Sequence, residues 1–222
     1  MMDQAPVLEF AAAVLMDGLS VDLSLGAGDL VLIDPGDEEH EREIADAACG
    51  LTPPLRGTVS MLGRDWMRLP PDHANALRGR IGHSFRRGSW VPHLSLIDNI
   101  LLPQLHHTTR PYGEIRDEAN RLSASFGLPG LPTVLPGQAT TPDLARADLI
   151  RAFTGSPDLV ILEGPPADSV GALINAIRNV RDRDGAVLWF TLDSALWYEP
   201  AIPATRRYRL RGDALVAEEG TR

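Results

Sequence analysis

Apolar residues follow two kinds of pattern along the chain. Continuous apolar runs, which are typical of strands covered on both faces of a sheet, occur at 30–33, 159–162 and 186–190. Shorter alternating patterns broken by glycine-containing turns occur within residues 7–29 and 57–63. The predicted strands lie within 7–15, 19–33, 57–63, 159–166 and 186–193, with a further strand at the end of 76–85 and a hairpin at 206–219.

Apolar residues at helical spacing lie between these strands. The predicted helices lie within 37–50, 112–128, 143–159 and 169–185. The segment from 88 to about 150 differs from the rest, because it is proline-rich at its start and helical afterwards. Strands that alternate with helices predict an α/β fold with a largely parallel sheet.

Composition limits the classes of function. The chain has 222 residues, 44% hydrophobic and 23% charged, which suits one globular domain. A formal net charge of −9 and a pI near 5.1 argue against nucleic-acid binding as the main activity. The single cysteine, Cys49, excludes an internal disulfide and suggests a reducing cytoplasm. The start of the sequence lacks a signal-peptide pattern, and no apolar run reaches the roughly 18 to 20 residues of a membrane span.

No metal site is expected, because the histidines lack a recognisable ligand spacing. The histidines considered are His83, His93, His106 and His107.

The stretch LVLIDPGDEEHEREIADAACGL, residues 30–51, combines a strand, a tight turn at Pro35-Gly36 and a helix. This arrangement binds phosphate in nucleotide-binding folds, because the first amides of the helix face the turn. Here, however, the turn and the first helical residues are acidic. The carboxylates are those of Asp37, Glu38, Glu39, Glu41 and Glu43.

Five segments, taken together and in order, resemble the ATP-binding cassette of ABC transporters over nearly the whole chain. They are LSLGAGDLVLI, CGLTPPLRGTVSMLGRD, RIGHSFRRGSWVPHLSLIDNILLP, RADLIRAFTGSPDLVILEGPP and AVLWFTLD. The resemblance implies a P-loop NTPase-like (RecA-like) fold with an antiparallel β subdomain and an inserted α-helical subdomain. It implies one cassette over 1–222, with a RecA-like and β lobe at 1–87 and 151–222 and a helical subdomain at 88–150.

The phosphate-binding motif of that family, G-x-x-x-x-G-K-[ST], is degenerate here. Its glycines admit backbone amides to phosphate, its lysine holds phosphate oxygens and its hydroxyl holds magnesium. The four positions fall on Pro35, His40, Glu41 and Arg42. A one-residue shift brings in Gly36 and places Arg42 at the lysine, but it leaves Glu41 at the second glycine and Glu43 at the hydroxyl.

The negative charges would act against a nucleotide as well. Asp37, Glu38 and Glu39 can serve as the anions of the helix N-terminus. A negative charge at this position stabilises an exposed helix by about 0.3–1 kcal/mol. Glu41 in place of a lysine turns attraction into repulsion. A unit pair at about 4 Å is worth about 4 kcal/mol at an effective dielectric of 20.

The other cassette motifs also depart from the family pattern. Glu163 and Gly164 occupy the aspartate and catalytic glutamate positions of LLLLDEPT, so a metal contact by Glu163 is conceivable whereas the catalytic carboxylate is absent. Leu192, after Thr191, occupies the switch-histidine position, and Arg86 replaces the glutamine that contacts the γ-phosphate. The LSGGQ signature aligns with ATTPD, residues 139–143, and FAAAVLMDG offers no obvious adenine-stacking aromatic.

The segment FRRGSWVPHLSL is read either as a loop anchored by one tryptophan or as a surface that docks a partner. The resemblance favours docking, because this segment leads into the helical subdomain of cassettes, beside the groove that receives a permease. The predicted docking residues are Arg86, Arg87, Trp90, Val91 and His93. For Trp197 and Tyr198 the sequence leaves core packing and a second interaction patch equally open.

The resulting hypothesis is a catalytically inactive cassette, a pseudo-ATPase without a nucleotide cofactor, that serves as a structural or regulatory subunit of a membrane ABC transporter. Its expected partners are a membrane permease, another cassette, or both, in a homo- or heterodimer and without nucleic acid. Its expected location is cytoplasmic, with peripheral attachment at the inner face of the cell membrane. One alternative is an atypical ATPase that binds ATP and magnesium through Arg42 and Glu163. The other is a stand-alone protein that self-associates.

Overall fold

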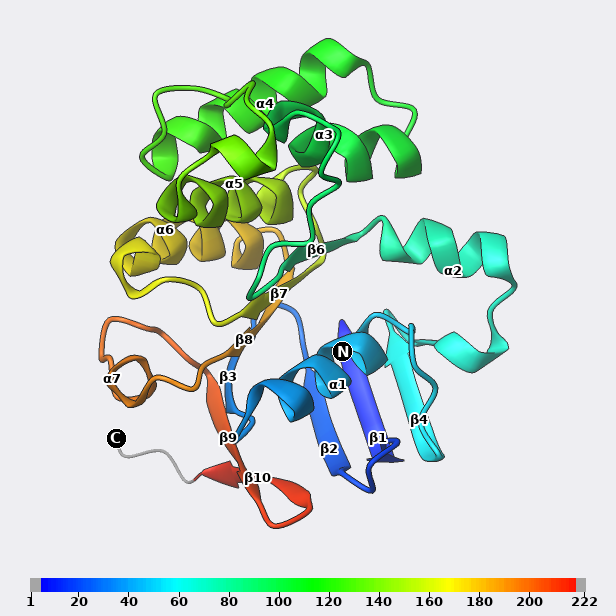
Figure 1. Cartoon of the computed structure of the whole chain (residues 1–222). Helices are drawn as coiled ribbons and strands as arrows, with labels where there is room; N and C mark the ends of the chain where they lie inside the picture. Colours follow the sequence, from blue (N-terminus) through cyan, green and yellow to red (C-terminus); the bar gives the residue numbers. More distant parts are fainter. Residues whose placement is uncertain (1–4, 219–222) are drawn as a thin grey trace.

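A computed structural model describes residues 5–218, so the first four and the last four residues of the chain lie outside the described part. Ten strands form one sheet in the order β5-β4-β1-β2-β10-β9-β3-β8-β7-β6. Strands β9, β3, β8, β7 and β6 pair in parallel, whereas β5, β4, β1 and β2 pair antiparallel. This confirms the predicted fold class, with a parallel centre and an antiparallel β region (Figure 1).

The strand bounds follow the apolar patterns closely. The strands are β1 Leu8–Val14, β2 Ser20–Leu25, β3 Leu30–Asp34, β4 Arg56–Met61, β5 Arg64–Asp65, β6 Ile81–Ser84, β7 Leu159–Glu163, β8 Ala186–Phe190, β9 Arg206–Arg211 and β10 Ala214–Glu218. Every residue of β7 and β8 is buried, as expected for parallel strands that are covered on both faces. Strands β9 and β10 form the predicted hairpin, whose last predicted residue, 219, lies outside the described residues.

The helices divide between the two faces of the sheet. They are α1 Glu38–Ala48, α2 Pro71–Arg78, α3 Leu96–His107, α4 Tyr112–Ser125, α5 Thr141–Phe153, α6 Val170–Arg181 and α7 Ser194–Trp197. Helix α1 lies on one face, and α3 to α6 gather on the other (Figure 1). No helix in the described part of the chain is long and apolar enough to cross a membrane.

Two hydrophobic cores result from this division. One packs α1 and the antiparallel strands against residues such as Ile33 and Leu188. The other packs α3 to α7 against residues of the opposite face, such as Leu32 and Trp189. Helices α3, α4 and α5 therefore share a core with the sheet and do not form a separate hydrophobic unit. The division of the chain at residues 88 and 150 stays a prediction.

The structure resolves elements that the sequence pattern left open. Trp197 is 4% exposed and belongs to the second core, whereas Tyr198 is 73% exposed. Helix α2 was not predicted, because its eight residues are too few to show a helical period.

Candidate functional site

The site is built at the edge where β3, β7 and β6 end and where α1 begins. Asp37 caps α1: its Oδ1 accepts hydrogen bonds from the amides of Glu39 and His40, both at 2.9 Å. Its Oδ2 also contacts Nδ1 of His40 at 2.8 Å. The first amides of the helix, which would face a phosphate, thus already bind a carboxylate of the chain. This confirms the predicted role of Asp37 as an anion at the helix N-terminus.

The connection from β3 to α1 is short. Only residues 35–37 separate the two elements, so His40, Glu41 and Arg42 lie inside the first turns of the helix. A phosphate-binding motif requires four residues between its two glycines, in a loop whose amides surround the phosphate. Here the corresponding residues belong to the first turns of α1. The amide of His40 donates to the side chain of Asp37, and the amide of Glu41 donates to the Asp37 carbonyl.

Glu41 points into the protein and is paired there. Its side chain is 2% exposed, and its two carboxylate oxygens accept from Nε and Nη2 of Arg86 at 2.9 and 2.5 Å. Burial raises the pKa of Glu41, and the hydrogen bonds from Arg86 only partly offset this effect. From the sequence, Glu41 is expected to be a repulsive charge that faces a nucleotide. The structure differs, because Arg86 neutralises that charge and occupies the space beside it.

The carboxylate of Glu163, at the end of β7, also has hydrogen-bond partners within the chain. Its Oε1 lies 2.7 Å from Nε2 of His83, and its Oε2 accepts from the backbone amide of Arg86 at 3.3 Å. Gly164 follows with φ = +50°, and a Cβ at this position would lie 2.5 Å from the guanidinium carbon of Arg86. The absence of a side chain at position 164 therefore leaves room for Arg86.

His83 connects this carboxylate to the single cysteine. Its Nδ1 lies 3.7 Å from Sγ of Cys49, and its ring stacks on Phe85 at 3.9 Å between centroids. Burial opposes protonation of the imidazole, but the contacts with Cys49 and Glu163 together raise the pKa of His83 to about 10. His83 is therefore a cation at neutral pH, and it compensates the buried charge of Glu163. No group of three or more possible metal ligands occurs among residues 5–218.

A second buried network fixes the start of the segment that follows β6. Oδ2 of Asp148, on α5, accepts from Oγ of Ser84 and from the amide of Phe85, both at 2.7 Å. Arg151 pairs with the same carboxylate and lies over the rings of Phe85 and Trp90, at 5.3 and 4.5 Å. Sequence reasoning missed these roles, since the hydrogen bonds of Ser84 and Phe85 to Asp148 join residues 64 and 63 positions apart.

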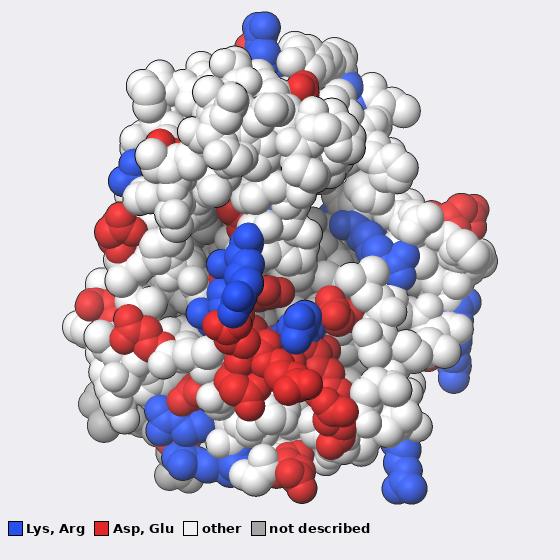
Figure 2. All heavy atoms as spheres, viewed as in Figure 1, with Lys and Arg blue, Asp and Glu red and all other residues white. Residues whose placement is uncertain are grey.

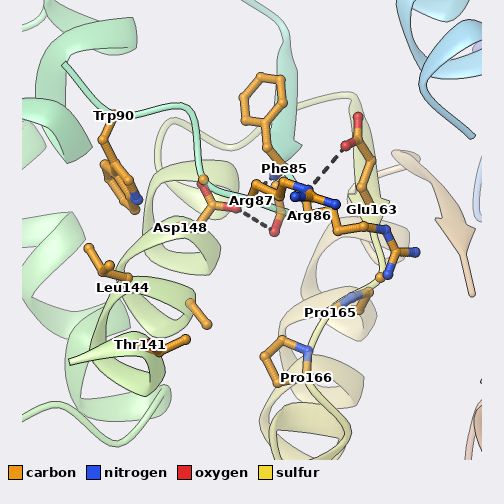
Figure 3. Close-up of a pocket in the computed structure, with 14 residues that line it drawn as sticks. Phe85, Arg86, Arg87, Trp90, Thr141, Leu144, Asp148, Glu163, Pro165 and Pro166 are labelled. Atoms are coloured by element: carbon orange, nitrogen blue, oxygen red, sulfur yellow. Dashed lines mark hydrogen bonds between the residues drawn. The ribbon is translucent and has the colours of Figure 1, made fainter. Parts of the chain in front are cut away.

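Little open space remains at the site. Two adjoining pockets of about 150 and 210 Å³ flank Arg86, one towards α5 and one towards α1. Both are smaller than the roughly 300–1,000 Å³ of typical ligand clefts. Figure 3 shows the first pocket, in which Thr141, Leu144 and Pro166 lie opposite Trp90 and Arg87.

The remaining predicted positions lie at the surface around these pockets. Leu192 is 40% exposed and follows the buried Thr191. At the start of α5, Oγ1 of Thr140 accepts from the amide of Asp143, so this second helix N-terminus is also capped within the chain. Arg42 is exposed on α1.

The predicted docking residues do not all face outwards. Arg86 points inward to Glu41, whereas the Arg87 side chain is 83% exposed and pairs with Glu38 at 2.8 Å. Trp90 and Val91 are half-buried and His93 is exposed. Partner docking at these positions stays a prediction.

The charges of this face confirm its acidic character. Figure 2 shows acidic side chains gathered over α1, with a few arginines beside them. All 21 strongly basic side chains of the sequence are arginines, so the chain contains no lysine that could hold phosphate oxygens.

Comparison with solved structures defines the class of fold. The dimeric structure of MJ0796, a bacterial ABC transporter cassette, superposes with a TM-score of 0.76 at 18% identity, covering all of this chain and 99% of that one. An ATP-binding subunit of an ABC transporter gives a TM-score of 0.77 at 17% identity, covering 96% and 89% of the two chains. The chain therefore has the P-loop NTPase fold of an ABC cassette.

Sequence comparison finds relatives of the same kind. The intermembrane phospholipid transport system ATP-binding protein MlaF of Haemophilus influenzae is 27% identical over 133 residues, which are 58% of this chain and 50% of MlaF. The macrolide export ATP-binding/permease protein MacB of Rhodopirellula baltica is 26% identical over 205 residues, 90% of this chain and 29% of MacB. The chain thus spans half or less of these relatives' length, and no protein family's sequence model matches it. Its homologues are ATP-binding proteins of ABC transporters.

Proposed function

We propose that this chain is a catalytically inactive ABC-type cassette that serves as a structural or regulatory subunit of a membrane ABC transporter. The observation that carries the proposal is the ion pair between Arg86 and the buried Glu41 in the first turn of α1, next to the helix N-terminus that would face a phosphate. The cap of the α1 N-terminus by Asp37 and the absence of lysine from the sequence also support the proposal.

The ion pair makes nucleotide binding costly. If a phosphate took Arg86 as its own partner, the buried Glu41 would be left without one. Separating a buried pair costs about 3 kcal/mol or more. That cost alone would weaken binding by at least about a hundredfold, before the repulsion from Asp37 and Glu38 is counted.

A transporter role is favoured by the relatives, which are transport proteins, and by the retained scaffold. We therefore propose a cytoplasmic chain attached peripherally to the membrane, with a permease subunit, another cassette, or both as partners. Trp90, Arg87 and His93 form the proposed docking surface. A photo-crosslinking residue at position 93 should join the chain to an integral membrane subunit of its own cell, whereas the same residue at position 64, on β5, should not.

The rival hypothesis of an atypical ATPase makes a different prediction. If Arg42 and Glu163 supported hydrolysis, the purified chain would turn over Mg-ATP and Glu163→Gln would abolish turnover. We expect no turnover by either form. Arg80→Gln, which removes an ion pair with Asp158 elsewhere on the sheet, is the matched control for any loss through misfolding.

The hypothesis of a stand-alone, self-associating protein is tested by sedimentation. A stable homodimer over a wide concentration range, together with failure of crosslinking at position 93, would favour it. A monomer would leave the transporter-subunit proposal in place.

A further inference from the structure

Two arginines join the segment after β6 to the first turns of α1. Arg86 binds Glu41 with two hydrogen bonds, and Arg87 binds Glu38 at 2.8 Å. Glu38 and Glu41 are three residues apart, so they lie on the same side of the helix. The two ion pairs differ in burial, because the Glu41 side chain is 2% exposed whereas Arg87 is 83% exposed.

The same segment is fastened to the helices on the opposite face of the sheet. Nη1 of Arg151, on α5, donates to the carbonyl of Ser89 at 2.7 Å, and its guanidinium lies over the Trp90 ring. The amide of Val91 donates to Oδ1 of Asn99, on α3, at 2.8 Å. Residues 85–91 are therefore attached at one end to α1 and at the other to α3 and α5.

We propose that Arg86 and Arg87 form a latch that, in addition to the core shared with the sheet, holds helices α3 to α5 in one orientation relative to α1, without any bound ligand. Arg86 carries most of the effect, because its partner is buried and unscreened, whereas salt screens the exposed pair of Arg87. The latch goes beyond the proposed lack of nucleotide binding, since it states what the arginine does mechanically. It also keeps Trp90 and Val91 in a fixed position, which would lower the entropy cost of binding a partner there.

Gly164 provides the space that the Arg86 side chain of the latch occupies. A methyl group at this position would lie 2.5 Å from the guanidinium carbon of Arg86 and would force the side chain to move. Gly164→Ala therefore disturbs the latch while every charged residue of the site remains. It provides a second variant with which to test the proposal.

The test is a distance measurement between spin labels on the two sides of the latch. Labels at Met67→Cys and Glu114→Cys, both exposed, are introduced into a Cys49→Ala background. Met67 follows Trp66, whose indole donates to the Ala48 carbonyl on α1, and Glu114 is on α4. We expect one narrow distance distribution that millimolar Mg-ATP does not change.

The double variant Arg86→Gln/Arg87→Gln should broaden or shift this distribution, and Gly164→Ala should do so to a lesser degree. The control is Arg80→Gln, which removes a bidentate arginine–carboxylate pair with Asp158 and should leave the distribution unchanged. A distribution that stays narrow without both arginines, or that is already broad in the parent, would overturn the latch. Neither result bears on nucleotide binding, which calorimetry on the same samples measures separately.

Discussion

The interiors of the parallel strands and the edge at which they end acquire their partners in different ways. Inside the sheet, residues such as Leu32, Leu188 and Trp189 are fully buried by apolar neighbours. Burial of these side chains requires only that the neighbours be apolar, not that one particular partner be present. At the edge, Glu41, Glu163 and Asp148 are buried as well, but each requires a particular donor: Arg86, His83 or Arg151. The comparison teaches that burial of an apolar side chain needs no particular partner, whereas burial of each carboxylate needs a matching donor.

The largest effect should come from the interior. Trp189→Ala should lower the free energy of unfolding by about 3–5 kcal/mol, because it leaves a cavity in the second core. Trp189→Phe should cost much less, since Nε1 of this indole has no hydrogen-bond partner to lose. Urea unfolding measures both, and a cost below about 1 kcal/mol for Trp189→Ala would show that this core tolerates voids.

The next effect is at the edge and depends on pairing. Arg86→Ala should cost about 3 kcal/mol, because it strands the buried carboxylate of Glu41. The double variant Glu41→Leu/Arg86→Met should be more stable than Arg86→Ala alone, since it removes both charges. If the double variant proves the less stable of the two in chemical denaturation, the edge is not organised by this ion pair.

A smaller effect should depend on pH. Against the penalty of burial, Cys49 and Glu163 raise the folded-state pKa of His83 to about 10. The protonated imidazole therefore stabilises the folded protein fully below the unfolded-state pKa of about 6.5, and this contribution is lost as pH rises towards 10. His83→Gln should cost about 1–3 kcal/mol near pH 6, because Glu163 loses its charged partner.

The measurement is the difference in melting temperature between wild type and His83→Gln across that pH range. The difference should narrow as pH rises. A difference that stays constant, or that grows with pH, would show that His83 is neutral in the folded protein.

The smallest effect should come from the cap of α1. Asp37→Ala should cost about 1 kcal/mol, because it removes the acceptor for the amides of Glu39 and His40. Asp37→Asn keeps an acceptor oxygen and is the matched control. Equal melting temperatures for Asp37→Ala and wild type would mean that the cap contributes nothing to stability.

The sequence predicts the buried strands of the sheet, because burial leaves a local signal, whereas the short helices α2 and α7 are not predicted. Runs such as those of β7 and β8 reveal strands covered on both faces. The departure of Glu41 and the acidic residues around it from the phosphate-binding pattern is also visible in the sequence.

The pairs at the edge left no such signal. Glu41 and Arg86 are 45 residues apart, and His83 and Glu163 are 80 apart. Nothing in their local sequences identifies these partners, so the charge of Glu41 was interpreted as repulsive although it is neutralised in the fold. Asp148 offers a weak hint, because it is a carboxylate between the buried apolar residues Ala147 and Leu149 of α5.

The most direct test of the central claim is a calorimetric titration of the purified chain with Mg-ATP and Mg-ADP up to millimolar concentration. The ion pair of Glu41 with Arg86 and the cap by Asp37 predict no heat of binding and no shift in melting temperature. Binding at micromolar strength would contradict this account. It would mean that Arg86 leaves Glu41 readily and that the edge of the sheet still admits a nucleotide.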